Sequence, residues 1–450
     1  MRASPNYKWY VLGAVMLGTV MGPFDASVAN VALTTIGRAF GTPVDNVEWV
    51  LLAYLLATAS SVVLFGRFGD MIGQKRVYLG AFLLFGSSSI ACALAPNLWA
   101  LIAARTAQGL GAAMLMACTL AIITDAFPST QRGRAIGLNG AAVAVGLTAG
   151  PVVGGLIVTY ADWRWIFLIN VPISIAALLV AAAVLKPEAG HPAKFDLWGA
   201  ALASSALFAF SLALSRAHVW GWGAPMTLGL IAYSAAALVA FVKAERLARA
   251  PIVDLSLFSN RTFAFSVLAA TLYFCAVFCV IFTVPLAAQL VLGRSGLQAG
   301  LLLLPISALN VVLAPAAGAL SDRMPARYIS TVGASLVALG SLLVVLLPAT
   351  PAPWMIAACL VVAGCGTAAF SQPNNSAIMG AAPHERRGVA AGIVATARTT
   401  GQLLGVALAG AIYFFVAGHS PPQSFLAAKA VFAMVAALMT LVAIVSFKRE

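Results

Sequence analysis

Apolar residues fill the chain in runs of about 20 residues, which short segments rich in Gly, Pro and charged side chains separate. A helix rises about 1.5 Å per residue, so such a run crosses about 30 Å of hydrocarbon. The alternating pattern typical of membrane barrel strands does not occur. The runs therefore predict an all-α polytopic membrane protein with fourteen transmembrane helices. We expect them near residues 9–31, 47–66, 77–95, 98–124, 135–158, 166–185, 197–215, 226–243, 263–290, 298–320, 328–348, 354–376, 388–416 and 425–447.

Composition supports the membrane class and excludes a soluble globular protein. Hydrophobic residues make up 62% of the chain and charged residues 9%, whereas a soluble chain carries about 25% charged residues. The net charge of +13 invites comparison with nucleic-acid-binding proteins. No run of basic residues interleaved with aromatic residues exists, and cytoplasmic loops of membrane proteins collect Lys and Arg. We therefore expect the lipid bilayer as a partner, and no nucleic acid.

The distribution of basic residues orients the predicted helices. With a cytoplasmic N-terminus, 19 of the 26 Lys and Arg residues lie on the cytoplasmic side and 5 on the outer side, while Arg105 and Arg398 lie within helices. Basic residues concentrate in cytoplasmic loops, and an even number of helices places both termini on one side. The expected location is the cell (inner) membrane, with several spans and both termini cytoplasmic.

Two short patterns occur once in each half of the chain. Residues 66–70 (GRFGD) follow the second predicted helix, and residues 318–323 (GALSDR) follow the tenth. Residues 132–137 (RGRAIG) precede the fifth helix, and residues 387–392 (RGVAAG) precede the thirteenth. Two parallel six-helix halves are a known transporter plan, with the substrate site at their interface. We expect a first bundle over 1–185, two inserted helices with cytoplasmic linkers over 186–262, and a second bundle over 263–450.

Four segments resemble motifs of one transporter family. They are residues 24–33 (FDASVANVAL), 66–76 (GRFGDMIGQKR), 101–111 (LIAARTAQGLG) and 146–155 (GLTAGPVVGG). Together they resemble the fourteen-helix drug:proton antiporters of the major facilitator superfamily, over nearly the whole chain. One departure is Thr34, where the first motif usually has Pro. The resemblance implies the major facilitator fold, alternating access, and a monomer.

Asp25 is the only acidic residue deep inside a predicted span. A carboxylate is costly in hydrocarbon, so it indicates function by default. Burial disfavours its charged form and a nearby cation favours it, so Asp25 is the expected site that exchanges a proton for substrate. By resemblance, Arg105 in the fourth helix assists this transfer. The alternatives are an Asp25 held permanently by Asn30 or by the fourth helix, and an Arg105 that only clamps helices together.

Gly146, Gly150 and Gly154 recur every four residues on one face of the fifth predicted helix, and Pro151 can bend that helix. Small residues at this spacing let two helices approach closely. By resemblance, this face is the interface between the two halves that seals and opens during transport. The alternative is tight packing without a switch.

A short cytoplasmic turn joins the second and third predicted helices. Its residues Gly66, Asp70, Gly73, Lys75 and Arg76 match the resembled motif. By resemblance, Asp70 and the basic residues latch the outward-open state through charge contacts, which form in one state only. The alternative is that the basic residues only hold the loop in the cytoplasm.

Several further side chains are candidates to line a substrate cavity, by their polarity or by an aromatic face that attracts cations. These are Phe24, Asn30, Tyr54, Gln108, Tyr273 and Arg398. For any single aromatic residue, a core or lipid-facing position is the alternative. Arg398 is equally compatible with a structural role.

The chemistry of an enzyme is not indicated. The four histidines lie in predicted loops without a nucleophile or a metal set, the six cysteines lie in apolar spans, and no Walker loop exists. We expect no metal and no cofactor. The predicted function is proton-coupled efflux of small hydrophobic or cationic compounds, as in multidrug export. The alternatives are a dedicated exporter of one metabolite or lipid, and a facilitator without proton coupling.

Overall fold

The computed structural model describes residues 6–128, 131–186, 197–247, 255–321, 324–383, 387–418 and 425–449. These residues fold into helices joined by short turns, and they contain no strand. An apolar chain satisfies every backbone hydrogen bond inside a helix, which is what a segment surrounded by hydrocarbon requires.

The helices form two bundles and a separate pair. The first bundle contains α1 (Tyr7–Phe40), α2 (Val44–Val47), α3 (Trp49–Ile72), α4 (Gln74–Ala93), α5 (Leu98–Ala126), α6 (Arg132–Tyr160), α7 (Trp165–Leu168) and α8 (Asn170–Val184). The pair is α9 (Leu197–Trp220) and α10 (Pro225–Leu247), followed by the 3₁₀ helix η1 (Leu255–Ser259). The second bundle contains α11 (Arg261–Leu290), α12 (Gly296–Leu301), α13 (Leu304–Ser321), α14 (Ala326–Leu346), α15 (Pro353–Ala381), α16 (Arg387–Ala417) and α17 (Leu426–Lys448).

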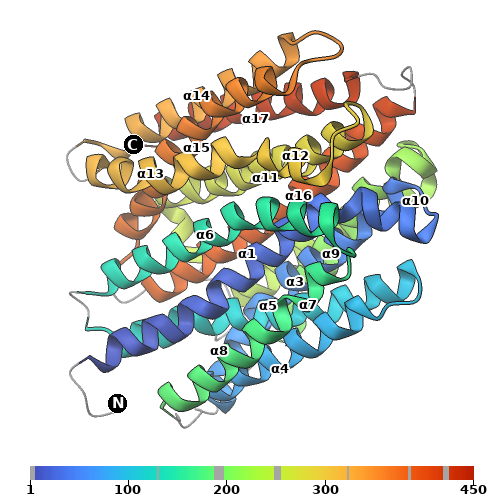
Figure 1. Cartoon of the computed structure of the whole chain (residues 1–450). Coiled ribbons are helices and arrows are strands. Elements are labelled where there is room, and N and C mark those ends of the chain that lie inside the picture. The colour runs from blue at the N-terminus through green and yellow to red at the C-terminus, as the bar shows by residue number, and fades with distance from the viewer. Residues whose placement is uncertain are drawn as a thin grey trace.

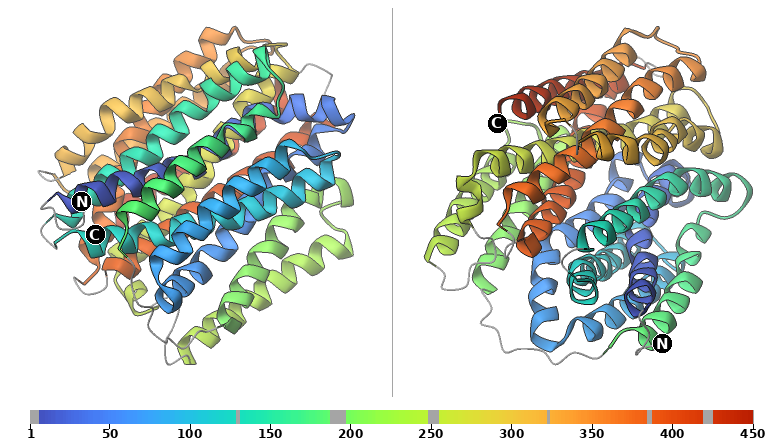
Figure 2. Two further views of the ribbon diagram at one scale, coloured as in Figure 1. Left: turned by 60° about the horizontal axis from the view of Figure 1, so that its bottom comes forward. Right: turned by 90° about the vertical axis from the view of Figure 1, so that its left-hand side faces the viewer.

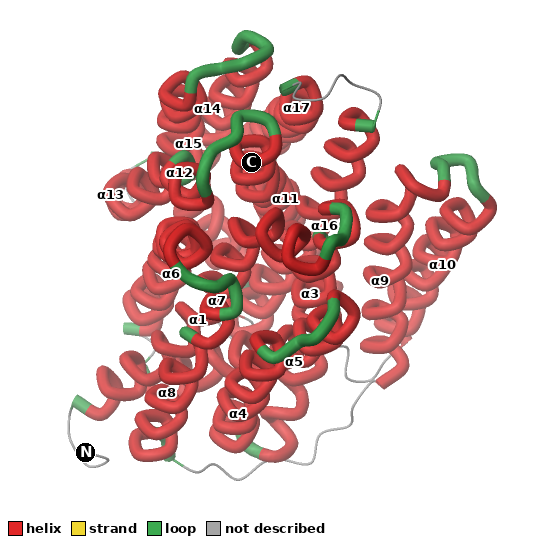
Figure 3. Tube along the Cα trace, turned by 45° about the vertical axis from the view of Figure 1, so that its right-hand side comes forward, coloured by secondary structure: helices red, strands yellow, loops and turns green. Residues whose placement is uncertain are grey.

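The two bundles lie side by side with their long helices running in similar directions (Figure 1). Both chain termini lie at one end of the molecule, here called the termini end, and the opposite end is called the far end (Figure 1). The right-hand view of Figure 2 looks roughly along the helices, and there the first bundle (blue to green) lies below the second bundle (yellow to red). In Figure 3 the pair α9 and α10 stands at the side, where α9 packs against α3 of the first bundle and α16 of the second.

The chain is a multi-pass membrane protein by the length and composition of its helices. Among the described residues, twelve helices are long and apolar enough to cross a membrane, with mean hydropathy from 1.4 to 2.5. Two further apolar segments, Trp49–Val62 in α3 and Ala201–Leu214 in α9, are too short within the described residues to count as full spans. The all-helical class is confirmed, and the count of fourteen spans stays a prediction.

Helix α1 is the central helix of the first bundle. Every residue from Phe24 to Thr34 is buried, so this stretch has no face turned to lipid. The prediction ended this helix near residue 31, but it continues to Phe40 and is capped by Gly41, whose φ of 59° is left-handed. Glycine adopts that conformation without the steric cost of a Cβ atom.

Equivalent glycines hold the central helix of each bundle. A Cβ atom at Gly146 or Gly150 of α6 would meet the backbone of α1 between Val20 and Phe24, at distances down to 2.6 Å. A Cβ atom at Gly401 or Gly405 of α16 would lie 2.4 Å from carbonyl oxygens of α11. The two bundles therefore share one packing arrangement, which supports the predicted parallel repeat.

Arg449 fastens the termini end of the second bundle. Its guanidinium is 1% exposed. It donates to Asn374 Oδ1 of α15 at 2.7 Å, to Ser266 Oγ of α11 at 3.2 Å and to Ser330 Oγ of α14 at 3.3 Å. One side chain thus joins three helices to the end of α17.

We expect Arg449→Ala to destabilise the purified protein by about 1–3 kcal/mol for each buried acceptor that loses its donor. Thermal unfolding in detergent measures this loss. Lys448→Ala is the matched control, because Lys448 is exposed beside it. Equal unfolding temperatures for the two variants would contradict the fastening role.

Candidate functional site

Two buried charges of the first bundle, one acidic and one basic, meet at one point. Asp25 of α1 and Arg105 of α5 form an ion pair through Oδ2 and Nη1, with exposed side-chain fractions of 1% and 0%. The Asp25 residue is central in α1, and Arg105 lies two helical turns into α5. The structure therefore brings together the two residues that the sequence singled out for proton coupling.

Two amide side chains complete the contacts of the carboxylate. Gln108 Nε2 donates to Asp25 Oδ1 at 3.0 Å, and Asn170 Nδ2 of α8 donates to the same oxygen at 2.7 Å. Gln108 Oε1 in turn accepts from Arg105 Nη1 at 2.7 Å, and Gln108 Nε2 also donates to Ser89 Oγ at 2.8 Å. The carboxylate of Asp25 thus accepts hydrogen bonds from side chains of both α5 and α8.

The guanidinium of Arg105 is held on its other sides by α3. Its Nε donates to the carbonyl oxygen of Val50 at 2.9 Å, and the guanidinium carbon lies 4.2 Å from the centre of the Tyr54 ring. Both Arg105 Nη2 and Asn170 Oδ1 are buried without a hydrogen-bond partner. The network thus keeps unused donor and acceptor capacity beside the ion pair, which a rearrangement or a water can use.

These contacts bear on the alternative that Asp25 is held permanently by Asn30 or by the fourth predicted helix. The carboxylate is indeed held by the helix that carries Arg105, but Asn30 takes no part in holding it. Asn30 instead donates through Nδ2 to the carbonyl oxygen of Ile281 in the second bundle. Sequence reasoning missed Asn170, although an amide directly at the start of an apolar helix is a signal that could have been used.

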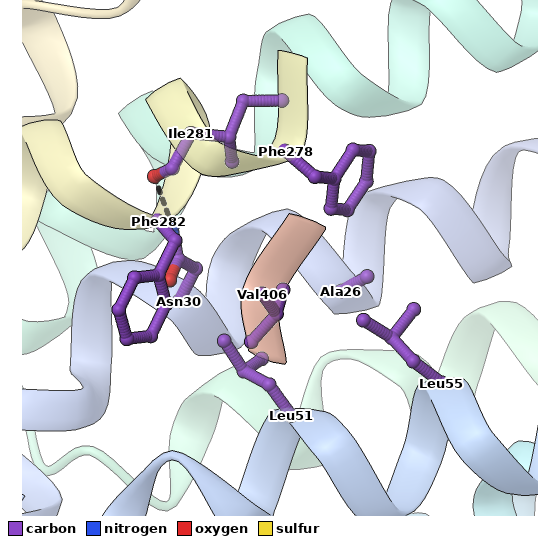
Figure 4. Close-up of a pocket in the computed structure, with 8 residues that line it drawn as sticks. All are labelled: Ala26, Asn30, Leu51, Leu55, Phe278, Ile281, Phe282 and Val406. Atoms are coloured by element: carbon purple, nitrogen blue, oxygen red, sulfur yellow. Dashed lines mark hydrogen bonds between the residues drawn. The ribbon is translucent and has the colours of Figure 1, made fainter. Parts of the chain in front are cut away.

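A small apolar cavity lies between the bundles beside this network. Figure 4 shows its lining, which comes equally from the two bundles. The residues are Ala26, Asn30, Leu51 and Leu55 from the first bundle, and Phe278, Ile281, Phe282 and Val406 from the second. Its volume is about 10 Å³, space for roughly one water molecule. The bundles therefore close almost completely on each other at this level.

Hydrogen bonds join the bundles toward the far end. Thr34 Oγ1 donates to Gln289 Oε1, and Gln289 Nε2 donates to the carbonyl oxygen of Val31 at 3.1 Å. The backbone N–H of Leu297 donates to Thr159 Oγ1 at 3.1 Å. Within the described parts of α1 and α11, no hydrogen bond joins these helices on the termini side of Asn30. The structure is thus one in which the far end is sealed.

The glycine face of α6 does not form the interface that the sequence suggested. A Cβ atom at Gly150 would lie 1.8 Å from Ser27 Oγ, and one at Gly154 would lie 3.0 Å from the carbonyl oxygen of Val28. Both contacts are with α1, within the same bundle, as they are for Gly146. The placement between the halves was wrong because glycine spacing reports a close approach and not the identity of the approaching helix.

The neighbouring face of α6 does meet the second bundle. A Cβ atom at Gly300 of α12 would lie 2.1 Å from the carbonyl oxygen of Pro151, and one at Gly155 would lie 2.7 Å from that of Gly296. Pro151 and Gly155 therefore lie where the first bundle meets Gly296 and Gly300 of the second.

The predicted cytoplasmic turn joins α3 to α4 through a single residue, Gly73, whose φ is 98°. Lys75 donates to the carbonyl oxygens of Ala182 and Leu185 at 2.8 and 2.5 Å, at the end of α8. A cation at a helix C-terminus is favourable. Arg76 is exposed. The side chain of Asp70 lies outside the described residues, and a Cβ atom at Gly66 would meet no atom.

The remaining cavity candidates lie at different places. Phe24 is buried where α1 meets α6, and Tyr273 stacks on Phe370 at 4.5 Å within the second bundle. Neither belongs to the cavity of Figure 4. Arg398 of α16 reaches the first bundle, where its Nη2 lies 3.8 Å from the sulfur of Met116. Tyr54 and Gln108 belong to the Asp25 network.

Known proteins resemble the chain over nearly its whole length. It is 36% identical to the uncharacterized transporter YebQ of Escherichia coli, over 95% of this chain and 93% of that protein. It is 34% identical to the riboflavin transporter RibZ of Clostridioides difficile, over 89% of this chain and 87% of RibZ. It is 33% identical to the multidrug resistance protein Stp of Mycobacterium tuberculosis, over 89% of this chain and 74% of Stp.

A solved structure and a family model agree with these similarities. The inward-facing, unoccupied bacterial homologue of the human lysosomal transporter Spinster superposes with a TM-score of 0.66 at 18% identity, and it covers 100% of this chain and 99% of its own. The model of the Major Facilitator Superfamily matches residues 15–406 and again residues 267–450. The chain therefore belongs to the major facilitator superfamily of membrane transporters.

Proposed function

We propose that this transporter exports small hydrophobic compounds across the cell membrane in exchange for protons, by alternating access between its two bundles. The observation that carries the proposal is the Asp25–Arg105 pair, a fully buried ion pair in the helix at the centre of the first bundle. Ionisable residues inside membrane helices are rare, and they mark proton relays and substrate pathways. Asp25 is the proposed proton-binding residue, and Arg105 is its partner.

Protonation would act through the ion pair. A proton on Asp25 removes the negative charge that compensates Arg105, and an uncompensated buried cation is strongly unfavourable. The network must then rearrange, and α1 carries the carboxylate. The same helix bonds to the second bundle through Asn30 and Thr34. A movement of α1 caused by a change at Asp25 would thus also act on the hydrogen bonds between α1 and α11 near the far end.

The wider architecture fits this cycle. We propose fourteen spans, with two six-helix bundles and α9 and α10 as the inserted pair, and with both termini in the cytoplasm as the basic residues indicate. In this orientation the sealed far end faces outward. We assign opening of that end to the contacts of Pro151 and Gly155 with α12, and we retain the turn around Gly73 and Lys75 as a gating element. A monomer is the proposed working unit.

The relatives support export without choosing its substrate. Stp is a multidrug resistance protein, and RibZ is a riboflavin transporter. Multidrug export is the function we favour, because the cavity between the bundles is lined mainly by apolar side chains, which discriminate poorly between hydrophobic compounds. A dedicated transporter of one metabolite is the second candidate, which the similarity to RibZ favours.

Energised cells test the export proposal. In a strain lacking its own efflux pumps, expression of the chain should lower accumulation of at least one compound in a panel of cationic, neutral and anionic hydrophobic dyes that includes ethidium. Collapse of the proton gradient by an uncoupler, with ATP maintained by glycolysis, should abolish the difference from cells with an empty vector. Export that persists without the gradient would contradict proton coupling.

A further inference from the structure

Arg398 is the second basic residue inside the predicted spans, and its bonding differs from that of Arg105. Its Nε is buried without a hydrogen-bond partner. Its Nη2 lies 3.8 Å from the sulfur of Met116. A thioether is a weak hydrogen-bond acceptor. Among the described residues it forms no ion pair. A half-buried guanidinium in this condition lacks the acceptors that normally accompany its burial.

The position of Arg398 is between the bundles, on the approach to the cavity. Arg398, Gln402 and Val406 follow one another at intervals of four residues, so they share one face of α16. Val406 lines the cavity of Figure 4. Arg398 lies two turns away toward the termini end, about 12 Å along the helix. Its neighbour Met116 belongs to the first bundle.

Two charged side chains lie along this path at opposite ends, Arg398 and Glu48, and a Cβ atom at Gly410 would lie 1.9 Å from Glu48 Oε2. The carboxylate of Asp25 is occupied by Arg105, Gln108 and Asn170 in this structure. A cationic compound that entered between the bundles at Arg398 would therefore meet a guanidinium, whereas the buried carboxylate of Glu48 lies beside Gly410, about 18 Å further along α16. A compound with an oxygen acceptor would instead supply the bonds that Arg398 lacks. Guanidinium groups bind such acceptors, and bidentate ones best.

We propose that Arg398 anchors the exported compound, and that the preferred substrates are hydrophobic molecules bearing an oxygen acceptor, either a carbonyl or an anionic group. This inference rests on the proposed export function and specifies its substrate class. It differs from the expectation from the sequence, which included cationic compounds beside hydrophobic ones. The apolar part of the compound would lie against the side chains that continue toward Val406 and Phe278.

In this proposal, proton binding and substrate binding take place in different bundles. Asp25 of the first bundle carries the proton, and Arg398 of the second bundle carries the substrate. The substrate then has no need to displace the proton at one shared site, and coupling arises from the movement of one bundle against the other. Variants at the two residues should accordingly affect different measurements.

Two probes with one ring system and opposite fixed charges test the anchor. They are 1-naphthalenesulfonate and 1-naphthyltrimethylammonium, with binding to the purified protein measured by equilibrium dialysis. We expect wild type to bind the sulfonate about tenfold more tightly than the ammonium compound, and Arg398→Gln to lose about tenfold of the sulfonate affinity. Arg398→Lys, which keeps the charge without the planar fork, should fall between them.

The control is Arg261→Gln, the same change at an exposed residue of α11, which should bind both probes as wild type does. Unfolding temperatures show that each variant is folded, and Arg398→Lys replaces Arg398→Gln if the latter is not. The proposal is overturned if the ammonium probe binds as tightly as the sulfonate, if neither probe binds, or if folded Arg398→Gln retains sulfonate affinity.

Transport into energised inside-out vesicles separates this inference from the export proposal. Uptake of the ammonium probe that depends on the proton gradient and is unaffected by Arg398→Gln would remove the anchor and leave export standing. Discriminating binding of the sulfonate without gradient-dependent uptake of either probe would remove proton-coupled export and leave the anchor standing. Sulfonate uptake that is lost in Arg398→Gln supports both.

Discussion

Arg105→Ala should be among the most destabilising single substitutions in the chain, by about 3–5 kcal/mol, because it leaves the buried carboxylate of Asp25 without its counter-charge. The alanine also removes the bond to the carbonyl oxygen of Val50 and the contact with the Tyr54 ring. Transport should be lost with it. Thermal unfolding of the purified protein measures the loss of stability.

The double variant Asp25→Asn/Arg105→Ala distinguishes a lost ion pair from lost packing. Neutralising Asp25 removes the uncompensated charge, so the double variant should unfold at a higher temperature than Arg105→Ala alone, while remaining inactive in coupled transport. Coupling between the two sites in such a cycle isolates their interaction. A double variant no more stable than Arg105→Ala would show that packing, and not charge, dominates at this site.

Gly150→Leu should have the second large effect, because α1 and α6 would have to move apart. The first side-chain carbon would lie 1.8 Å from Ser27 Oγ and 3.0 Å from the carbonyl oxygen of Phe24, which precedes Asp25. Overpacking of this kind costs about 1–3 kcal/mol, and the shift of α1 would displace Asp25 from its partners. We expect dye export in cells to fall to the level of the empty vector.

Gly13→Leu provides the matched control on α1. A Cβ atom at Gly13 would meet no atom within 4 Å, so this variant should export dye as wild type does. Membrane abundance of both variants must be measured alongside. If Gly150→Leu is present in the membrane and fully active, the close approach of α1 and α6 is not required for transport.

The sequence predicted the helices and the central pair well, for a clear physical reason. The hydrocarbon core imposes one length scale on every span, so apolar runs translate directly into helices. A carboxylate and a guanidinium inside such runs must find partners, which singles out Asp25 and Arg105. Their direct pairing, however, depends on how α1 and α5 rotate and pack, and no local pattern specifies that rotation.

Other features of the site could not be predicted from the sequence, because they depend on which helix packs against which. The spacing of Gly146, Gly150 and Gly154 indicated a close approach, but their partner is α1 and not the second bundle. Asn170 was missed because an uncharged amide in an apolar helix is cheap enough to be structural. The interpretation of Tyr54 as a cavity residue missed its place beneath Arg105, since an aromatic residue shows no direction in sequence.

Proton flux through reconstituted vesicles tests the central claim most directly. Purified wild type and Asp25→Asn would be sealed in vesicles with an acidic lumen, and lumenal pH would be followed while ethidium or 1-naphthalenesulfonate is added outside. Asp25 as the coupling group predicts that at least one probe discharges the gradient through wild type and that neither does so through folded Asp25→Asn. Equal discharge through both proteins, or no discharge through wild type with either probe, would contradict it.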